Sequence, residues 1–119
     1  MAHAQHMTSE MRACIQSCLD CYSICLETVQ HCLMMGGKHA DAKHIGLLKA
    51  CAKICETSAS FMLTGSEFHT RTCGVCAEVC HACAESCTRM AGGDETMQRC
   101  ADVCRRCAES CQQMAGASH

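Results

Sequence analysis

The sequence predicts an all-α fold, an antiparallel up-down-up-down four-helix bundle with a cysteine-lined core. Three observations predict it. Proline is absent while helix-forming residues are common, glycines divide the chain into four segments, and cysteines recur within the segments at steps of three or four residues. Short connections between the segments make consecutive helices antiparallel. All 119 residues are expected to form one domain, with residues 1–7 as a flexible tail.

Start and stop signals define the four expected helices, which cover residues 8–35, 40–63, 66–90 and 94–114. Residues that can cap a helix N-terminus stand at the starts, namely Thr8 or Ser9, Asp41, Ser66 and Asp94. Glycines follow the last turns of the first three helices, at Gly36, Gly65 and Gly92. An internal repeat supports this division, since residues 76–92 and 100–116 are identical at twelve of seventeen positions and each span one helix and its turn.

Charge and motif content argue against several functional classes. Ten Lys+Arg against twelve Asp+Glu give a formal net charge of −2, which is not that of a strongly basic nucleic-acid binder. The sequence contains no run of about 18 apolar residues, which is the length that a membrane-spanning helix needs. The first residues lack the pattern of a secretory signal peptide, so a cytoplasmic location is expected. No catalytic triad, acid–base carboxylate pair or phosphate-binding loop is visible, so no enzyme is expected.

The outlying feature is the presence of 16 cysteines among 119 residues. Leu, Ile, Val and Phe together are no more numerous than the cysteines, so thiols must occupy core positions that leucine usually fills. On each helix the cysteines form one stripe, which predicts that all of them face the bundle axis. They are Cys14, Cys18, Cys21, Cys25 and Cys32, then Cys51 and Cys55, then Cys73, Cys76, Cys80, Cys83 and Cys87, and finally Cys100, Cys104, Cys107 and Cys111.

Three explanations of this stripe are weaker than a thiolate store of soft metal ions. Alanine or leucine would pack a core as well without the reactivity of a thiol. Disulfides along one helix are disfavoured, because residues three or four apart have Cβ atoms about 5–6 Å apart and a disulfide needs about 3.5–4.5 Å; bridges between helices stay possible. Iron–sulfur ligands usually come from irregular segments, and the ferredoxin type of cysteine run ends in Cys-Pro.

Charge favours Cu(I) over Zn(II) among the soft metals that thiolates select. A zinc ion with four thiolates carries a net charge of −2, and several such units would leave a large negative charge in a dry core. Cu(I) accepts two thiolates in a nearly linear arrangement. If each thiolate bridges two ions, the ratio is about one Cu(I) per cysteine and the core is neutral.

The CxxxC and CxxC steps on the helices, and the run CxxCxxxCxxCxxxC from Cys73 to Cys87, resemble those of the bacterial copper storage proteins. The sequence shows no leader, and in this respect it resembles the cytosolic branch of that family. The resemblance implies a bundle that binds many Cu(I) ions through the sixteen cysteines, commonly as a homotetramer. The expected function is cytosolic storage of Cu(I). The open alternatives are a zinc or general soft-metal buffer resembling metallothionein, and a thiol redox or electron-transfer protein.

One end of the expected bundle is the candidate copper entrance. It gathers the turn between the first two helices and the turn between the last two. Imidazole and thioether groups gather there, and these weaker Cu(I) donors suit transfer more than storage; the resemblance places the open end there as well. The candidates are His31, Met35, His44, Met90 and Met97. The opposite end, with Phe61, Met62, Leu63, Phe68 and Met114, is expected to be an apolar plug.

The first helix carries a second apolar stripe, about 100° around the helix from the cysteines. It consists of Ile15, Leu19, Tyr22, Leu26, Val29 and Leu33. Either a neighbouring helix of the same chain covers this stripe, or it is a self-association surface.

Overall fold

The computed structural model describes residues 7–116, which form four long α-helices. These are α2 (Ser9–Met35), α3 (Ala42–Leu63), α4 (His69–Ala91) and α5 (Glu95–Gly116), and a 3-10 helix η1 (Gly37–Ala40) joins α2 to α3. The predicted all-α fold is confirmed. Of the predicted tail, residues 1–6 lie outside the described residues, and Met7 packs against the core.

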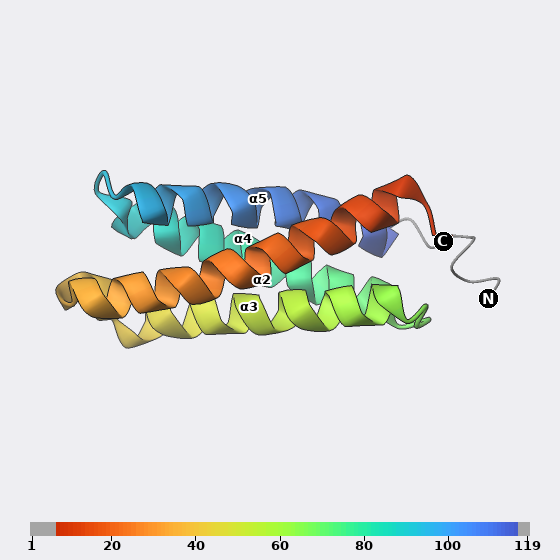
Figure 1. Cartoon of the computed structure of the whole chain (residues 1–119), viewed down its shortest axis with the longest axis horizontal. Helices are drawn as coiled ribbons and strands as arrows, with labels where there is room; N and C mark the ends of the chain where they lie inside the picture. The colour runs from red at the N-terminus through yellow and green to blue at the C-terminus, as the bar shows by residue number, and fades with distance from the viewer. Residues whose placement is uncertain (1–6, 117–119) are drawn as a thin grey trace.

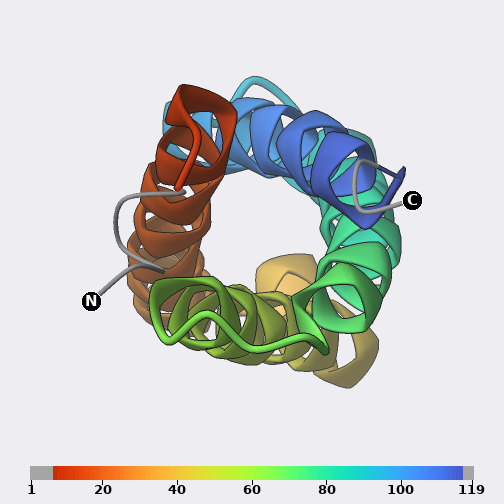
Figure 2. The ribbon, with the colours of Figure 1, turned by 90° about the vertical axis from the view of Figure 1, so that its right-hand side faces the viewer.

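The four helices surround one long axis. The bundle measures 50 × 20 × 20 Å, and Figure 1 shows α2 and α3 lying side by side along its length. Viewed down the axis, the helices follow one another around a ring in the order α2, α3, α4 and α5, and α5 returns to α2 (Figure 2). Consecutive helices therefore lie next to each other, as short connections require. We call the end with η1 and the α4–α5 turn the η1 end, and the other the α3–α4 end.

Side-chain caps fix three of the helix starts where the sequence predicts them. The Thr8 hydroxyl accepts from Met11 N at 3.0 Å, and the Asp41 carboxylate accepts from His44 N at 3.2 Å. The Asp94 carboxylate accepts from Met97 N at 2.9 Å. Each bond satisfies a backbone donor that the first helical turn leaves free.

The start of α4 differs from the prediction by three residues. Gly65, at φ 69°, reverses the chain, and Ser66 N then donates to Phe61 O at 2.9 Å. The Ser66 hydroxyl accepts from Phe68 N at 3.1 Å, so it stabilises the turn and does not cap a helix that starts at residue 66. Reversal of the chain occupies the residues that sequence periodicity assigned to the helix.

The core is built mainly from cysteine, alanine and a few larger side chains. Leu48 is the largest of the fully buried side chains, followed by Met62 and Met97. The buried polar side chains of residues 7–116 are Thr28, His44, Ser58 and Ser86, and none is a lysine or arginine. Leu48 occupies a position that would carry cysteine if α3 followed the stripe of the other helices.

Truncating Leu48 is expected to destabilise the metal-free protein strongly. Leu48→Ala leaves a cavity among small side chains that cannot close it, which costs about 2–5 kcal/mol of unfolding free energy. Urea unfolding of the reduced protein, followed by circular dichroism, measures this. Leu19→Ala is the matched control, because Leu19 is 38% exposed and its loss is expected to cost less than about 1 kcal/mol. Equal losses in the two variants would contradict the assigned core.

The second stripe of α2 divides between core and surface. Ile15 and Val29 are buried, whereas Leu19, Leu26 and Leu33 are exposed and lie seven residues apart on one face of the helix. Ile15 and Val29 therefore belong to the core of the same chain, and self-association through the exposed leucines stays a prediction. Within the described part of the chain, the structure contains no helix with the length and apolar character needed to cross a membrane.

Candidate metal centre

The sixteen cysteines are all free and fully shielded from solvent. They come from all four helices and face the axis seen in Figure 2. The prediction that the cysteines line the core is confirmed. A free cysteine tolerates burial as a small apolar residue, so thiols can fill the core positions that leucine usually fills.

Twelve of the thiols form five overlapping clusters in which all sulfur atoms lie within 4.8 Å of one another. From the α3–α4 end toward the η1 end, the clusters are Cys14–Cys73–Cys111, Cys18–Cys76–Cys107–Cys111, Cys55–Cys76–Cys80–Cys107, Cys21–Cys51–Cys55–Cys80 and Cys21–Cys25–Cys51–Cys104. Successive clusters share one or two members. The sulfurs therefore form one continuous column and not a set of separate sites.

We call the seven residues that belong to two clusters the shared thiols: Cys21, Cys51, Cys55, Cys76, Cys80, Cys107 and Cys111. Cys55 shows their environment. Its sulfur lies 3.6 Å from that of Cys76, 3.5 Å from that of Cys80 and 3.8 Å from that of Cys107. These distances are well above the roughly 2.05 Å of a disulfide, so the thiols are in van der Waals contact.

Cu(I) fits this spacing. With metal–sulfur bonds of about 2.3 Å, as for zinc, two sulfurs on opposite sides of a linear ion are about 4.6 Å apart, which the clusters span with small side-chain rotations. The column extends beyond the clusters, since Cys25 Sγ lies 4.0 Å from Cys100 Sγ.

The charges available in the core favour a metal content that leaves the metal ions and thiolates together without net charge. The thiols of the column titrate as a coupled set, since contact with the Cys107 thiol raises the pKa of Cys55 and contact with the Cys111 thiol lowers the pKa of Cys107. A metal ion that binds such a set displaces the protons that its thiols share. No lysine or arginine is buried among residues 7–116. The protein therefore supplies no buried positive charge to balance thiolates whose negative charge exceeds the positive charge of the bound metal. One monovalent ion per thiolate leaves no excess.

A different set of donors lies at the η1 end. Cys32 of α2 has its sulfur 3.4 Å from Met97 Sδ of α5 and 3.6 Å from His44 Nε2 of α3. All three side chains are buried. Burial, followed by the charge of Asp94, raises the pKa of Cys32 to about 11. Burial also lowers the pKa of His44, so the imidazole is neutral and one of its nitrogens can act as an acceptor or a metal ligand.

Asp94 links two of the helices that carry these donors. One carboxylate oxygen accepts from Met97 N at the start of α5, and the other lies 2.8 Å from Nε2 of His31 on α2. These two contacts, the backbone bond first, lower the pKa of Asp94. His31 is adjacent to Cys32 in sequence, so the carboxylate joins the end of α2 that carries Cys32 to the first turn of α5 that carries Met97.

The predicted entrance residues differ in where the structure places them. His44 and Met97 face Cys32, as described above. His31 is half-buried and directs Nε2 to Asp94. Met90 is partly buried against the core, and Met35 is 56% exposed at the last turn of α2.

The α3–α4 end is only partly the apolar plug that the sequence predicts. Met62 and Met114 are buried, but Leu63 and Phe68 are more than half exposed. Ser58 takes the place of a cysteine on α3, and its hydroxyl lies 3.9 Å from Cys73 Sγ. The thiol column therefore ends at the Cys14, Cys73 and Cys111 cluster.

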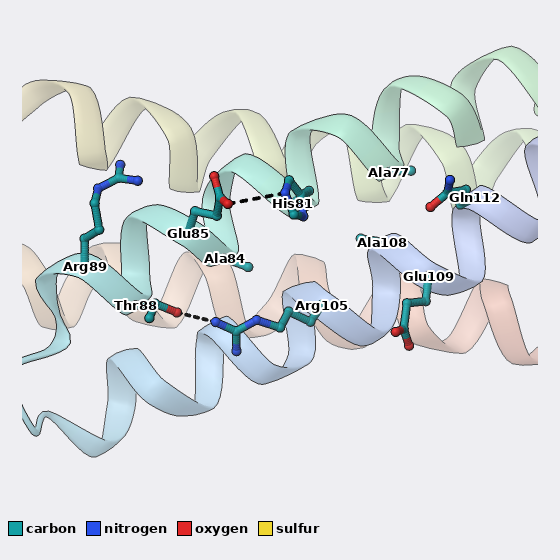
Figure 3. Close-up of a pocket in the computed structure, with 10 residues that line it drawn as sticks. All are labelled: Ala77, His81, Ala84, Glu85, Thr88, Arg89, Arg105, Ala108, Glu109 and Gln112. Atoms are coloured by element: carbon teal, nitrogen blue, oxygen red, sulfur yellow. Dashed lines mark hydrogen bonds and ion pairs between the residues drawn. The ribbon is translucent and has the colours of Figure 1, made fainter.

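A groove with a volume of about 600 Å³ lies on the outer side of α4 and α5 (Figure 3). Alanines and polar side chains line it, and Figure 3 shows the contacts of His81 with Glu85 and of Thr88 with Arg105. None of its lining residues is a cysteine or methionine. The candidate metal site is therefore inside the bundle and not in this surface groove.

Sequence reasoning missed Ser86. It lies between the stripe positions Cys83 and Cys87, and its hydroxyl oxygen is 2.8 Å from Nδ1 of His44. Both residues are buried. Nothing in the periodicity of α4 indicates this contact, because the partner is on another helix.

A helical bundle whose interior is a continuous column of free thiols defines a thiolate metal-binding protein of the storage class. Comparison with known proteins identifies its family. The model of the copper storage protein family matches residues 7–116, and the chain belongs to that family.

Solved structures agree with this assignment. The Nmul_A1745 protein from Nitrosospira multiformis is 48% identical, with a TM-score of 0.86 over 92% of this chain and 97% of that one. The Cu(I)-bound copper storage protein BsCsp3 is 34% identical, with a TM-score of 0.84 over 91% and 100%. A cytosolic copper storage protein from Streptomyces lividans, loaded with copper, is 33% identical, with a TM-score of 0.81 over 89% and 92%.

Proposed function

We propose that this chain stores Cu(I) ions as a column of copper thiolates along the bundle axis. The observation that carries the proposal is the continuous set of overlapping thiol clusters in a core that buries no lysine or arginine among residues 7–116. The ligands are the sixteen cysteines, and the stored ratio is about one Cu(I) per cysteine, because that ratio leaves the core neutral.

Copper enters at the η1 end in this proposal. His44 and Met97 lie beside Cys32, and a neutral imidazole or a thioether binds Cu(I) more weakly than a thiolate does. An incoming ion is therefore held loosely there and passes on to stronger ligands deeper in the bundle. His31, Met35 and Met90 are proposed as outer contacts on this route.

The chain acts by binding and release and not by catalysis. We propose that it is one metal-storage domain that works in the cytoplasm, as the Streptomyces lividans relative is described as cytosolic. We also propose that it forms a homotetramer. The exposed leucines of α2, Leu19, Leu26 and Leu33, supply an apolar face for association.

Anaerobic titration tests the stored metal and its ratio. The reduced protein is titrated with Cu(I) in the presence of a chromophoric Cu(I) chelator, and the chelate absorbs only after the protein is full. We expect saturation at about one Cu(I) per cysteine, and X-ray absorption is expected to show copper bound by sulfur alone at about 2.3 Å, by analogy with zinc. A parallel Zn(II) titration is the control.

Two results would contradict storage of Cu(I). One is saturation at a few ions per chain, with Zn(II) displacing Cu(I), as a zinc buffer would show. The other is a purified protein that carries a coloured cluster or cycles between thiols and disulfides, as a redox protein would.

A further inference from the structure

Each donor of the η1-end site comes from a different helix. Cys32, His44 and Met97 are on α2, α3 and α5. The fourth helix, α4, brings the hydroxyl of Ser86 to within 2.8 Å of His44 Nδ1. The imidazole is thus held from one side by α4 and faces Cys32 on the other.

We propose that Ser86 is a positioning residue for copper transfer, one that holds the His44 ring so that the Nε2 lone pair faces Cys32. This inference rests on the proposed function. In a neutral imidazole one nitrogen carries the proton and the other is the acceptor. If Nδ1–H donates to the Ser86 hydroxyl oxygen, Nε2 is the unprotonated nitrogen that can bind Cu(I).

Burial makes this contact decisive. The Ser86 and His44 side chains are 3% and 1% exposed, so water does not replace the hydroxyl as the partner of Nδ1. The backbone of His44 is fixed as well, because its N–H donates to the Asp41 carboxylate in the first turn of α3. Loss of the hydroxyl therefore frees the ring to rotate or to move its proton to Nε2, where the proton would block the metal. Outer partners of this kind usually change metal affinity or activity by about 10–100-fold.

The test is the rate at which metal-free protein takes Cu(I) from a chromophoric chelate, measured anaerobically by stopped flow. We expect Ser86→Ala to slow the first phase about tenfold or more and to leave the final copper content unchanged. His44→Ala is expected to slow it to a similar extent, and Ser86→Ala added to His44→Ala is expected to have no further effect. Ser86→Thr, which keeps the hydroxyl, is expected to retain the rate.

Ser58→Ala is the matched control, because Ser58 is a second fully buried serine whose hydroxyl lies near a thiol, Cys73, at the α3–α4 end. It is expected to take up copper at the wild-type rate. A wild-type rate in Ser86→Ala would overturn the inference. The inference would also be overturned if Ser86→Ala slowed copper uptake equally in the wild type and in His44→Ala, since that result assigns Ser86 a general structural role.

A second measurement on the metal-free protein separates this inference from the proposed function. The nitrogen-15 chemical shifts of the His44 ring are expected to show a protonated Nδ1 and a bare Nε2 in the wild type, and a mixed or reversed pattern in Ser86→Ala. A protonated Nε2 in the wild type would overturn the inference, whatever the copper capacity is. Failure of the wild type to bind about one Cu(I) per cysteine would instead overturn the storage function, because Ser86 does not determine that ratio.

Discussion

Copper loading is expected to stabilise the folded bundle by more than any single substitution destabilises it. A ligand at about 100 times its dissociation constant contributes about 2.7 kcal/mol per site. A few such sites together match the about 5–15 kcal/mol of a typical domain. Here each of the five clusters draws its sulfurs from three helices, so ions bound between helices link segments that separate on unfolding.

Urea unfolding under anaerobic conditions measures this effect. We expect the loaded protein to keep its far-ultraviolet circular dichroism at urea concentrations that fully unfold the reduced, metal-free protein. The unfolded chain also binds Cu(I) through its thiolates, which reduces the gain. Only the folded chain, however, holds four sulfurs from three different helices within 4.8 Å of one another. Coincident unfolding curves would show that copper does not bind inside the bundle.

Removing two shared thiols is expected to reduce copper capacity by more than two ions. Cys55 and Cys107 each belong to two clusters, so each thiolate bridges ions on both sides along the column. In Cys55→Ser/Cys107→Ser, every ion that used one of these thiolates loses at least one of its two ligands. A serine hydroxyl is a harder donor and does not replace a thiolate for Cu(I). The anaerobic titration described above gives the capacity.

Cys14→Ser/Cys73→Ser is the matched control. These two cysteines belong only to the terminal cluster, so we expect this variant to lose two ions or fewer. Buried serines without partners cost about 1–3 kcal/mol each, so both pairs are also made with alanine and checked by circular dichroism. Equal losses in the terminal pair and the shared pair would mean that each cysteine holds its own ion independently, which contradicts a bridged column.

Local sequence signals were sufficient for the fold. Alternating steps of three and four residues have one structural solution, a helix with one buried stripe, and the cysteines of all four helices follow it into the core. Thr8, Asp41 and Asp94 cap their helices because a short side-chain oxygen bonds to a donor three residues away. The exception was the start of α4, where the reversal after Gly65 depends on a bond back to Phe61.

The candidate site was predictable only in its donor types. The sequence supplies thiols in number but not their order along the axis, because the register between helices decides which sulfurs meet. His31 shows the limit. It stands next to Cys32 in the chain, yet its Nε2 contacts Asp94 on another helix. Met35 continues the stripe of α2 but is exposed at the last residue of that helix.

By itself, the sequence determined that the chain is an all-helical bundle and that its thiols face inward, since helical periodicity and burial depend on residues a few positions apart. Only the tertiary structure decided which thiols are shared between clusters, and that Ser86 faces His44. Those contacts join residues tens of positions apart, and their distances follow from how four helices pack against one another.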